Sequence, residues 1–165
     1  MKTLLDACCG SKMFHFDKNN ENVLFCDNRH ETHMLCDGRV LNIKPDMIVD
    51  FKNMPHENDH FDGVIFDPPH LDKAGPQSWQ AKKYGKLDRK TWREELSKGF
   101  EECWRVLKPG GFLFFKWNET QIKLRDVLAC FSQTPTFGHT TTHNLKTHWV
   151  IFYKPRVDIE KEVRK

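Results

Sequence analysis

Four aspartates stand at the ends of apolar runs, where their carboxylates could meet a common ligand. The runs cover residues 3–7, 23–27, 46–50 and 61–67, and the acids are Asp6, Asp27, Asp50 and Asp67. Such runs are typical of strands buried on both faces of a parallel sheet, whose carboxyl ends share one ligand-binding edge. A single acid could equally cap a helix. Four in succession predict a polar ligand rich in hydroxyl and amino groups.

The position of Asp27 narrows the class of ligand. It lies about 20 residues past the turn CCGSK (8–12), where a dinucleotide-binding fold places the acid that binds ribose hydroxyls. The turn contains Gly10 but lacks G-x-G-x-x-G, so the sequence gives little support for backbone approach to a pyrophosphate. A nucleoside ligand without phosphates therefore fits better than a nicotinamide dinucleotide, which disfavours a nicotinamide oxidoreductase.

The fourth run ends in the stretch Asp67-Pro68-Pro69-His70. Two prolines cannot continue a central strand, and they fix φ at consecutive residues without requiring N–H partners. Taken alone, the stretch fits a rigid strand-to-loop turn with a capping aspartate as well as it fits a site that aims a carboxylate and an imidazole at a ligand.

Together, these segments resemble the motifs of class I S-adenosylmethionine-dependent methyltransferases. LLDACCGSK is similar to the first motif in its D-P-F-x-G-S-G form: Asp6, Gly10 and Ser11 match, whereas Ala7, Cys8 and Lys12 depart from it. FCDNR resembles the second motif, IVDF the adenine-binding segment, and VLKPGGFLFFK the entry to the fifth strand. DPPH resembles the D/N-P-P-aromatic signature of enzymes that methylate planar amines, with histidine in the aromatic position. The resemblance covers roughly residues 3–153.

The resemblance implies a Rossmann-like α/β fold: a mostly parallel seven-stranded sheet with one antiparallel strand, flanked by helices. It also implies S-adenosylmethionine as cofactor. The cofactor-binding residues that it assigns are Asp6, Ala7, Cys8 and Gly10 at the methionine end, Asp27 at the ribose, and Asp50 with Phe51 at the adenine.

The implied reaction is methylation of an exocyclic amine of a nucleobase, adenine N6 first, in DNA or RNA. Such an amine is a poor nucleophile because its lone pair is delocalised. The Asp67 carboxylate and the Pro68 carbonyl would accept its two N–H bonds, localise the lone pair and stabilise the developing positive charge. Pro69 would keep the turn rigid, and His70 would stack on the base or hydrogen-bond to it.

A basic segment, residues 72–93, supports a nucleic-acid partner. It carries seven Lys or Arg against two Asp, with Trp79, Tyr84 and Trp92 interleaved, a composition suited to phosphates and stacked bases. The same segment could be a surface loop that closes over any substrate. Two other functions stay open: methylation of a nitrogen in a protein or small molecule, and a non-catalytic nucleic-acid-binding module with this fold.

The elements that must position these residues follow from periodicity. Apolar residues at spacings of three and four predict helices over 88–107 and 119–131, and residues 111–117 predict a fifth strand after a turn. Two strands with a turn near Asn144 follow, the stronger at 149–153. The segment HETHMLCDGRVLNIKP (30–45) could hold a turn of helix. This plan gives one domain over 1–155 and a charged tail over 156–165, either a frayed helix or disordered.

Composition excludes several classes of protein. The chain has 165 residues, 30% charged residues and a net charge of +3, and no apolar run approaches the length of a membrane helix. Six cysteines at no framework-like spacing and the absence of a signal peptide predict reduced thiols in a cytoplasmic protein. His30, His33 and Cys36 are spaced three apart but lack a fourth ligand, so we expect no metal site. Nothing in the sequence indicates an oligomeric state.

Overall fold

The computed structural model describes residues 2–35, 37–73, 75, 78–138 and 145–156. A seven-stranded sheet forms its centre, with the strand order β5-β2-β1-β6-β7-β9-β8. The strands are β1 (Leu4–Asp6), β2 (Val23–Asp27), β5 (Met47–Ile48), β6 (Phe61–Phe66), β7 (Leu107–Asn118), β8 (Phe137–Gly138) and β9 (Thr147–Tyr153). The strands from β5 to β7 are parallel, and β9 runs antiparallel to both β7 and β8. The predicted fold class is confirmed.

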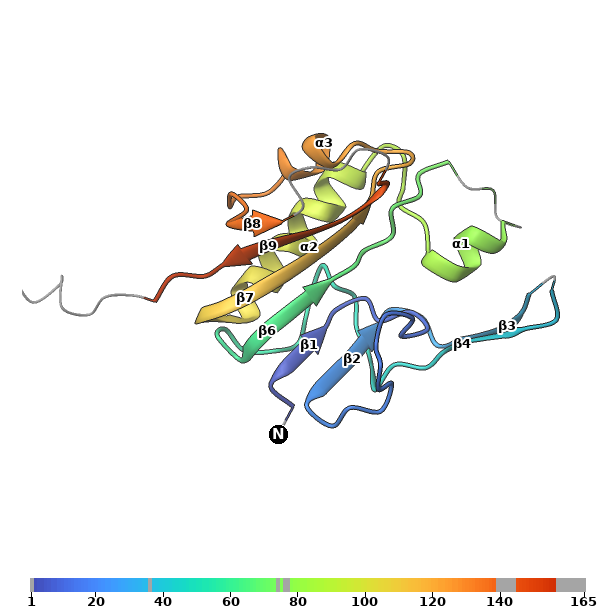
Figure 1. Cartoon of the computed structure of the whole chain (residues 1–165), viewed down its shortest axis with the longest axis horizontal. Coiled ribbons are helices and arrows are strands. Elements are labelled where there is room, and N and C mark those ends of the chain that lie inside the picture. The colour runs from blue at the N-terminus through green and yellow to red at the C-terminus, as the bar shows by residue number, and fades with distance from the viewer. Residues whose placement is uncertain (1, 36, 74, 76–77, 139–144, 157–165) are drawn as a thin grey trace, which may run out of the picture.

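Each of the five predicted apolar runs forms a strand of this sheet. Four of these strands, β1, β2, β6 and β7, are labelled in Figure 1. The third run is the exception in length, because only Met47 and Ile48 pair with β2. Both residues are exposed at the edge of the sheet, where a strand has one neighbour instead of two. The turn expected near Asn144 and the tail from residue 157 lie outside the described residues.

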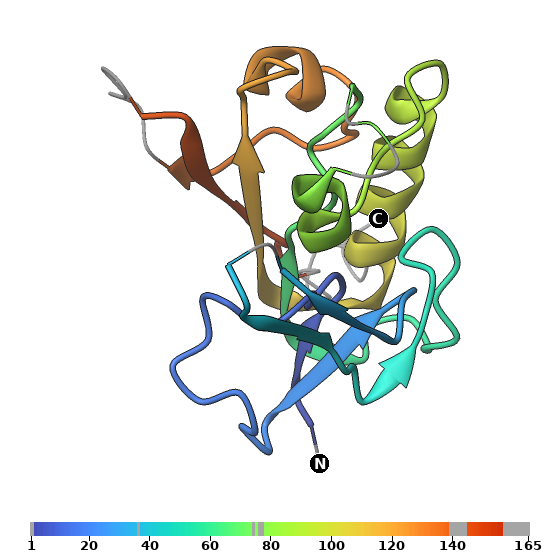
Figure 2. The same ribbon diagram turned by 90° about the vertical axis from the view of Figure 1, so that its right-hand side faces the viewer.

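Helix α2 (Trp92–Val106) covers one face of the sheet (Figures 1 and 2). It starts four residues after the predicted position, because the carboxylate of Asp88 accepts the N–H of Lys90 and holds residues 88–91 in a turn. The N–H of Asp88 in turn donates to Glu95 on the first turn of the helix, at 3.3 Å. Strand β7 begins directly after Val106, so α2 and β7 are joined without a connecting loop.

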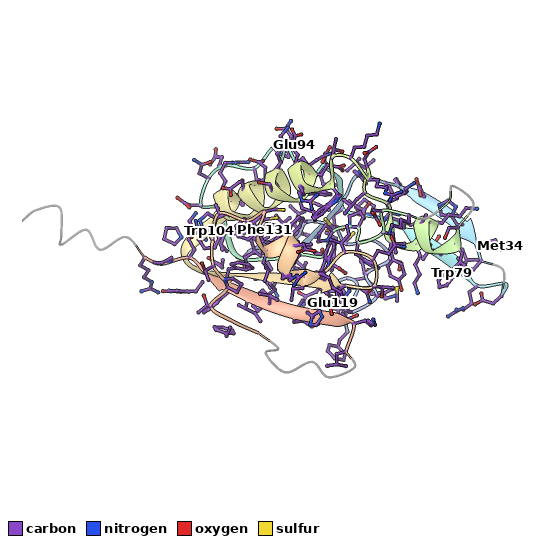
Figure 3. The ribbon with its side chains drawn as sticks, turned by 90° about the horizontal axis from the view of Figure 1, so that it is seen from above. Met34, Trp79, Glu94, Trp104, Glu119 and Phe131 are labelled. Carbon is purple, nitrogen blue, oxygen red and sulfur yellow. The ribbon has the colours of Figure 1, made fainter. Side chains whose placement is uncertain are left out.

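The second predicted helix is much shorter than expected. The sequence predicts residues 119–131, whereas α3 covers only Leu124–Leu128. The N–H of Leu124 donates to the carboxylate of Glu119, so the preceding residues form turns instead of helix. Phe131 lies beyond the helix and still packs on the core, stacked 4.3 Å from the ring of Phe100 on α2. Phe100 also stacks on Trp104 of the same helix, with the ring centroids 6.0 Å apart. Figure 3 labels Trp104 and Phe131.

Residues 30–45 form an antiparallel hairpin, so the expectation of a helical turn is wrong. Strands β3 (Glu31–Met34) and β4 (Val40–Ile43) pair across a turn that contains Asp37 and Gly38. Gly38 has φ +81, which suits glycine in such a turn. Burial alternates along β4, as expected for a strand with one covered face. The hairpin extends to the same end of the molecule as Trp79 of the short helix α1 (Trp79–Tyr84), as Figures 1 and 3 show.

The two faces of the sheet differ in how they are covered. Residues 7–22 connect β1 to β2 through turns and contain no helix, although the structure describes all of them. Part of this connection lies on the face opposite α2, where Phe14 meets Trp149 of β9 edge to face at 5.5 Å. Phe112 and Phe114 of β7 remain 37% exposed on the same face. Among the described residues, no helix combines the length and apolarity that crossing a bilayer requires.

Candidate active site

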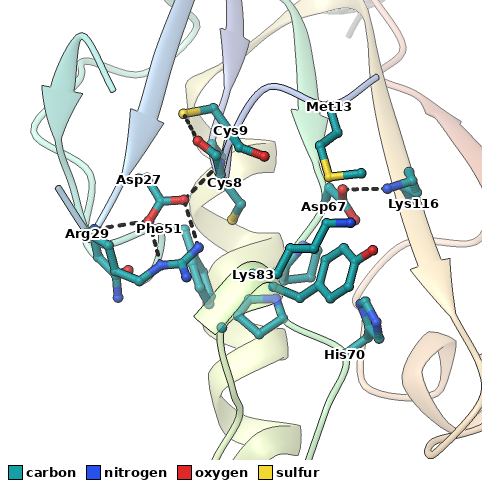
Figure 4. A pocket seen from close by; sticks show the side chains of 18 of the residues that line it. Cys8, Cys9, Met13, Asp27, Arg29, Phe51, Asp67, His70, Lys83 and Lys116 are labelled. Carbon is teal, nitrogen blue, oxygen red and sulfur yellow. Dashed lines mark hydrogen bonds and ion pairs between the residues drawn. The ribbon is translucent and has the colours of Figure 1, made fainter. Parts of the chain in front are cut away.

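A cavity of about 380 Å³ lies at the carboxyl edge of the parallel strands (Figure 4). Most residues predicted to bind ligand line it: Ala7, Cys8, Gly10, Asp27, Phe51, Asp67, Pro68, Pro69 and His70. These residues come from the ends of β1, β2, β5 and β6, whose parallel pairing brings them to one edge. The arrangement is the one expected for ligand sites in open α/β sheets. Asp6 and Asp50 do not line the cavity.

Asp6 acts behind the first turn. Its side chain is fully buried, accepts the N–H of Cys8 at 3.2 Å, and lies 2.7 Å from Nε2 of His15. Burial raises the pKa of this carboxyl, and the hydrogen bond to His15 opposes that rise. Asp6 therefore shapes the turn that carries Ala7 and Cys8 without reaching the cavity itself.

Asp27 connects the first turn to the end of β2. Its Oδ2 accepts the N–H of Gly10 at 2.9 Å, and its Oδ1 accepts Nε of Arg29 at 3.1 Å. Nη1 of Arg29 donates to the carbonyl oxygen of Lys82 in α1, at 3.0 Å. The carboxylate is thus oriented by donors from two residues, Gly10 and Arg29, and Arg29 also attaches α1 to the same end of the cavity. Gly10 has φ +50, a conformation that favours glycine.

The two consecutive residues predicted for an adenine ring direct their side chains to different places. Phe51 is 7% exposed, lines the cavity and meets Phe66 edge to face at 5.4 Å. The Asp50 carboxylate accepts the N–H of Lys52 at 2.9 Å and lies 3.6 Å from its ammonium nitrogen. Asp50 therefore closes a local turn at the surface, and the structure brings only Phe51 to the cavity.

Asp67 forms an ion pair with Lys116 at the border of the cavity. Nζ of Lys116 lies 2.6 Å from Oδ2 of Asp67 (Figure 4), and the two side chains are 23% and 19% exposed. Burial raises the pKa of Asp67 to about 6, although the charge and hydrogen bond of Lys116 act in the opposite direction. Asp67 is therefore mostly ionised at pH 7 and can accept hydrogen bonds.

His70 follows the two prolines and lies beside Tyr84 of α1. The two ring centroids are 5.1 Å apart with the planes tilted by 50°. Burial, together with the neighbouring charge of Lys116, lowers the pKa of His70 to about 4. The imidazole is therefore neutral at pH 7. Gly85, with φ +76, passes so close to Pro69 that a Cβ would lie 2.9 Å from its Cγ, which packs the end of α1 onto the proline turn.

A second cavity of about 270 Å³ adjoins the first. The residues common to both are Asp67, His70, Tyr84 and Lys116. The remaining walls come from Leu71, Trp79, Asn118, Thr120, Gln121 and Thr147. Oε1 of Gln121 accepts the N–H groups of Asp72 and Lys73 at 2.8 and 3.0 Å, so its carboxamide is held in a fixed orientation. Asp67 is thus placed between two cavities of different lining.

The thiols near the site are unreactive by position. Burial raises the pKa of Cys8, Cys9, Cys26 and Cys103, so all four stay protonated at neutral pH. These four and Cys130 are free thiols. Over the part of the chain that the structure describes, no group of three His, Cys, Asp or Glu side chains is arranged to hold a metal ion. His30 and His33 flank the start of β3, and Cys36 lies outside the described residues.

Lys116, Arg29 and Phe14 line the cavity but were not predicted as site residues. Lys116 could have been noticed, because it is a lone cation in the apolar run GFLFFKW and stands at the end of the predicted strand. Arg29 could have been found from its position two residues after the predicted ribose-binding acid. Phe14 gives no local signal, since its role depends on how residues 7–22 fold back over the sheet.

Comparison with known proteins shows the fold. No protein-family model matches the chain, and no curated protein does. The PH0226 protein from Pyrococcus horikoshii OT3 superposes with a TM-score of 0.50 at 15% identity, over 93% of this chain and 82% of its own. A Methanococcus maripaludis protein provisionally named an S-adenosyl-L-methionine-dependent methyltransferase gives 0.49 at 13% identity, over 96% and 80%. A SAM-dependent methyltransferase from Leishmania major gives 0.49 at 13%, over 90% and 63%.

Proposed function

We propose that this protein is an S-adenosylmethionine-dependent methyltransferase whose acceptor is an exocyclic amine of a nucleobase, adenine N6 first, in DNA or RNA. The observation that carries the proposal is the position of Asp67. Asp67 lies at the border between two cavities. The first is lined by the predicted cofactor residues, and the second by aromatic and carboxamide groups. A group that must act on both donor and acceptor belongs at such a border.

The first cavity suits a nucleoside with an amino-acid extension. The Asp27 carboxylate lines one end of the cavity and would accept ribose hydroxyls there, and Phe51 would provide an apolar wall for the base. Its volume, about 380 Å³, falls within the range of ligand sites for molecules of this size. The cofactor, when bound, would supply a methyl group activated by a sulfonium centre. Ala7, Cys8 and Gly10 would line its methionine end.

The second cavity suits a planar acceptor. Asp67 and the Pro68 carbonyl would accept the two N–H bonds of its amine, orient the nitrogen for in-line transfer and stabilise the positive charge that develops on it. His70 is neutral at pH 7, so it would stack without repelling that charge. Tyr84 and Trp79 offer further aromatic surface on the same side.

A nucleic-acid partner is supported by the cations around the opening. Lys83 and Lys86 line the first cavity, and the segment 72–93 supplies further basic residues next to Trp79 and Tyr84. Ammonium groups beside exposed aromatic rings would bind phosphates while bases stack. Lys83 already lies 5.0 Å from the Tyr84 ring centroid.

The test is transfer of a labelled methyl group from S-adenosylmethionine to separate pools of DNA, RNA and protein. We expect transfer to nucleic acid, at N6 of adenine. Asp67→Ala should reduce the rate at least about a hundredfold, which is typical for loss of one oriented charge-stabilising group. Asp62→Ala is the matched control, because Asp62 lies on β6, the strand that Asp67 directly follows, also pairs with a lysine of β7 at 2.7 Å, and is exposed.

Three outcomes would contradict the proposal in different ways. If calorimetry detects no heat of binding with S-adenosylmethionine, the cofactor assignment is wrong. If methyl groups are transferred to protein alone, the acceptor is a protein and not a nucleic acid. If the protein binds nucleic acid but transfers methyl groups to no pool, it is a non-catalytic binding module. If Asp67→Ala transfers methyl groups at the wild-type rate, Asp67 and the proline turn do not orient the acceptor amine.

A further inference from the structure

Lys116 occupies a position along the sheet edge that the proposed nucleic-acid chemistry leaves unexplained. The strand order places β5 and β2 at one end, then β1, β6 and β7. Phe51 and Asp27 follow β5 and β2, so a nucleoside held by them would leave its extension pointing across β1 toward β6 and β7. Lys116 is the cavity-lining residue of β7 and therefore lies at the far end of that path.

The ammonium of Lys116 is held by one carboxylate and two aromatic rings. Its Nζ lies 2.6 Å from Asp67 Oδ2, 5.0 Å from the Phe14 ring centroid and 6.0 Å from that of Trp149. Aromatic faces attract a cation without supplying a hydrogen-bond acceptor. The ammonium has three N–H donors, so it can bind a second carboxylate at modest cost in rearrangement.

The other cations of the cavity are less suitable for that end. Lys83 and Lys86 come from α1 and the residues after it. The Lys83 ammonium lies 5.0 Å from the Tyr84 ring centroid and 5.7 Å from that of Trp79, so it is directed toward residues that line the second cavity. Phe14, which contacts Lys116, belongs instead to the connection after β1, whose first residues would line the methionine end.

We propose that Lys116 binds the carboxylate at the amino-acid end of the cofactor, and that this contact draws its ammonium away from Asp67. The inference rests on the proposed function. Before the cofactor binds, Lys116 compensates the charge of Asp67. Once the cofactor is bound, a carboxylate shares the ammonium, and Asp67 becomes available to the N–H bonds of the acceptor. Cofactor binding thus prepares the acceptor site, and the donor would bind first.

The test compares S-adenosylmethionine with its decarboxylated analogue by isothermal titration calorimetry at pH 8. For Lys116→Met we expect S-adenosylmethionine to bind about tenfold to a hundredfold more weakly, as for loss of a charged hydrogen bond. The variant should bind the decarboxylated analogue within about twofold of the wild-type affinity, since that ligand has no group for Lys116. Lys108→Met is the matched control, because Lys108 lies on the same strand and forms a 2.7 Å ion pair with Asp62 away from the cavity.

Asp67→Asn provides an independent measurement. Removing the competing carboxylate should leave the affinity for S-adenosylmethionine unchanged or increase it, whereas a purely structural pair would lose affinity when either partner is changed. Equal loss for both ligands in Lys116→Met, or a loss in Asp67→Asn as large as that in Lys116→Met, overturns the inference. If wild-type protein binds S-adenosylmethionine and Lys116→Met binds it equally, the inference fails while the proposed function stands.

Folding is checked for each variant by circular dichroism and thermal unfolding. Should Lys116→Met not fold, Lys116→Arg keeps the cation and is expected to retain the preference for S-adenosylmethionine over the decarboxylated analogue. The inference is wrong if folded Lys116→Arg no longer prefers S-adenosylmethionine to the decarboxylated analogue. It is also wrong if the wild-type protein shows no such preference. Failure of wild-type protein to bind either ligand contradicts the proposed function as well.

Discussion

The N–H of Gly10 donates a 2.9 Å hydrogen bond to Oδ2 of Asp27, across 17 positions of sequence. This bond joins the turn after β1 to the end of β2, the two segments that the sequence assigns to opposite parts of one ligand. Asp27 is 4% exposed, and Arg29 lies against its other oxygen. The geometry of the first turn therefore depends on a side chain that is itself predicted to bind ribose.

Replacing Asp27 should weaken cofactor binding. Asp27→Ala removes the proposed acceptor for ribose hydroxyls and leaves the N–H of Gly10 without its carboxylate, so we expect about a tenfold to hundredfold loss of affinity in calorimetry. Asp37→Ala is the matched control, because Asp37 accepts the N–H and guanidinium of an arginine two residues later in the same way, in the exposed hairpin turn. An unchanged affinity for Asp27→Ala would exclude the ribose role.

The pH dependence of transfer should report the ionisation of Asp67. Burial raises its pKa to about 6, so the carboxylate becomes protonated as the pH falls through that value. Protonated Asp67 accepts hydrogen bonds poorly. The kcat/KM for the cofactor, which reports the free enzyme in which Lys116 pairs with Asp67, should therefore decrease below pH 6 and be constant between pH 7 and 8. Because Lys116 lowers the pKa of Asp67, Lys116→Met should shift the decrease to higher pH, and Lys108→Met should not.

Replacing His70 should weaken the interaction with the acceptor and leave the affinity for the cofactor unchanged. Its neutral ring lies at the border of the second cavity beside Tyr84, where stacking on a base would contribute about 1–3 kcal/mol. His70→Ala is expected to lower kcat/KM for the acceptor about tenfold or more, whereas His70→Phe should retain most of it. Calorimetry with S-adenosylmethionine should give the wild-type affinity for both variants. A pH profile shifted in His70→Phe would indicate that the imidazole acts through a proton instead.

Gly99 of α2 should be intolerant of a methyl group. A Cβ there would lie 2.4 Å from Cδ2 of Phe51 and 2.8 Å from Cζ of Phe66, although alanine is otherwise favoured inside a helix. Gly99→Ala should lower the free energy of unfolding by about 1–3 kcal/mol in urea titration. It should also weaken cofactor binding, because the ring that must move lines the first cavity. Ser97→Ala, on the same helix, should be neutral or stabilising.

Local signals in the sequence were sufficient for the five strands that form from apolar runs and for most cavity residues. An apolar run specifies a buried strand because its residues must all leave water, and a parallel sheet gathers the residues after each strand at one edge. Hence Asp27, Phe51 and Asp67 could be predicted as neighbours. The hairpin over 31–43 was also detectable in principle, because Asp37 and Gly38 separate two alternating segments.

Other features depend on contacts between distant segments. Helix periodicity overestimated both helices, since side chains such as Glu119 accept backbone N–H groups just before the helix and hold the chain in turns. Asp50 satisfies every local criterion for a ligand-binding acid, yet its carboxylate is directed to Lys52 at the surface. The direction in which a side chain at the end of a strand points depends on the conformation of the following turn. The pattern of apolar residues does not encode that conformation.

The sequence by itself determined the sheet, the edge at which a ligand would bind, and the rigid turn that carries Asp67. Only the tertiary structure decided that Lys116 would meet it. In the register of β6 and β7, Phe66 lies opposite Phe115, so the next residues, Asp67 and Lys116, stand side by side although 49 positions separate them. That register results from packing along the whole length of two strands against α2, which no stretch of sequence contains alone.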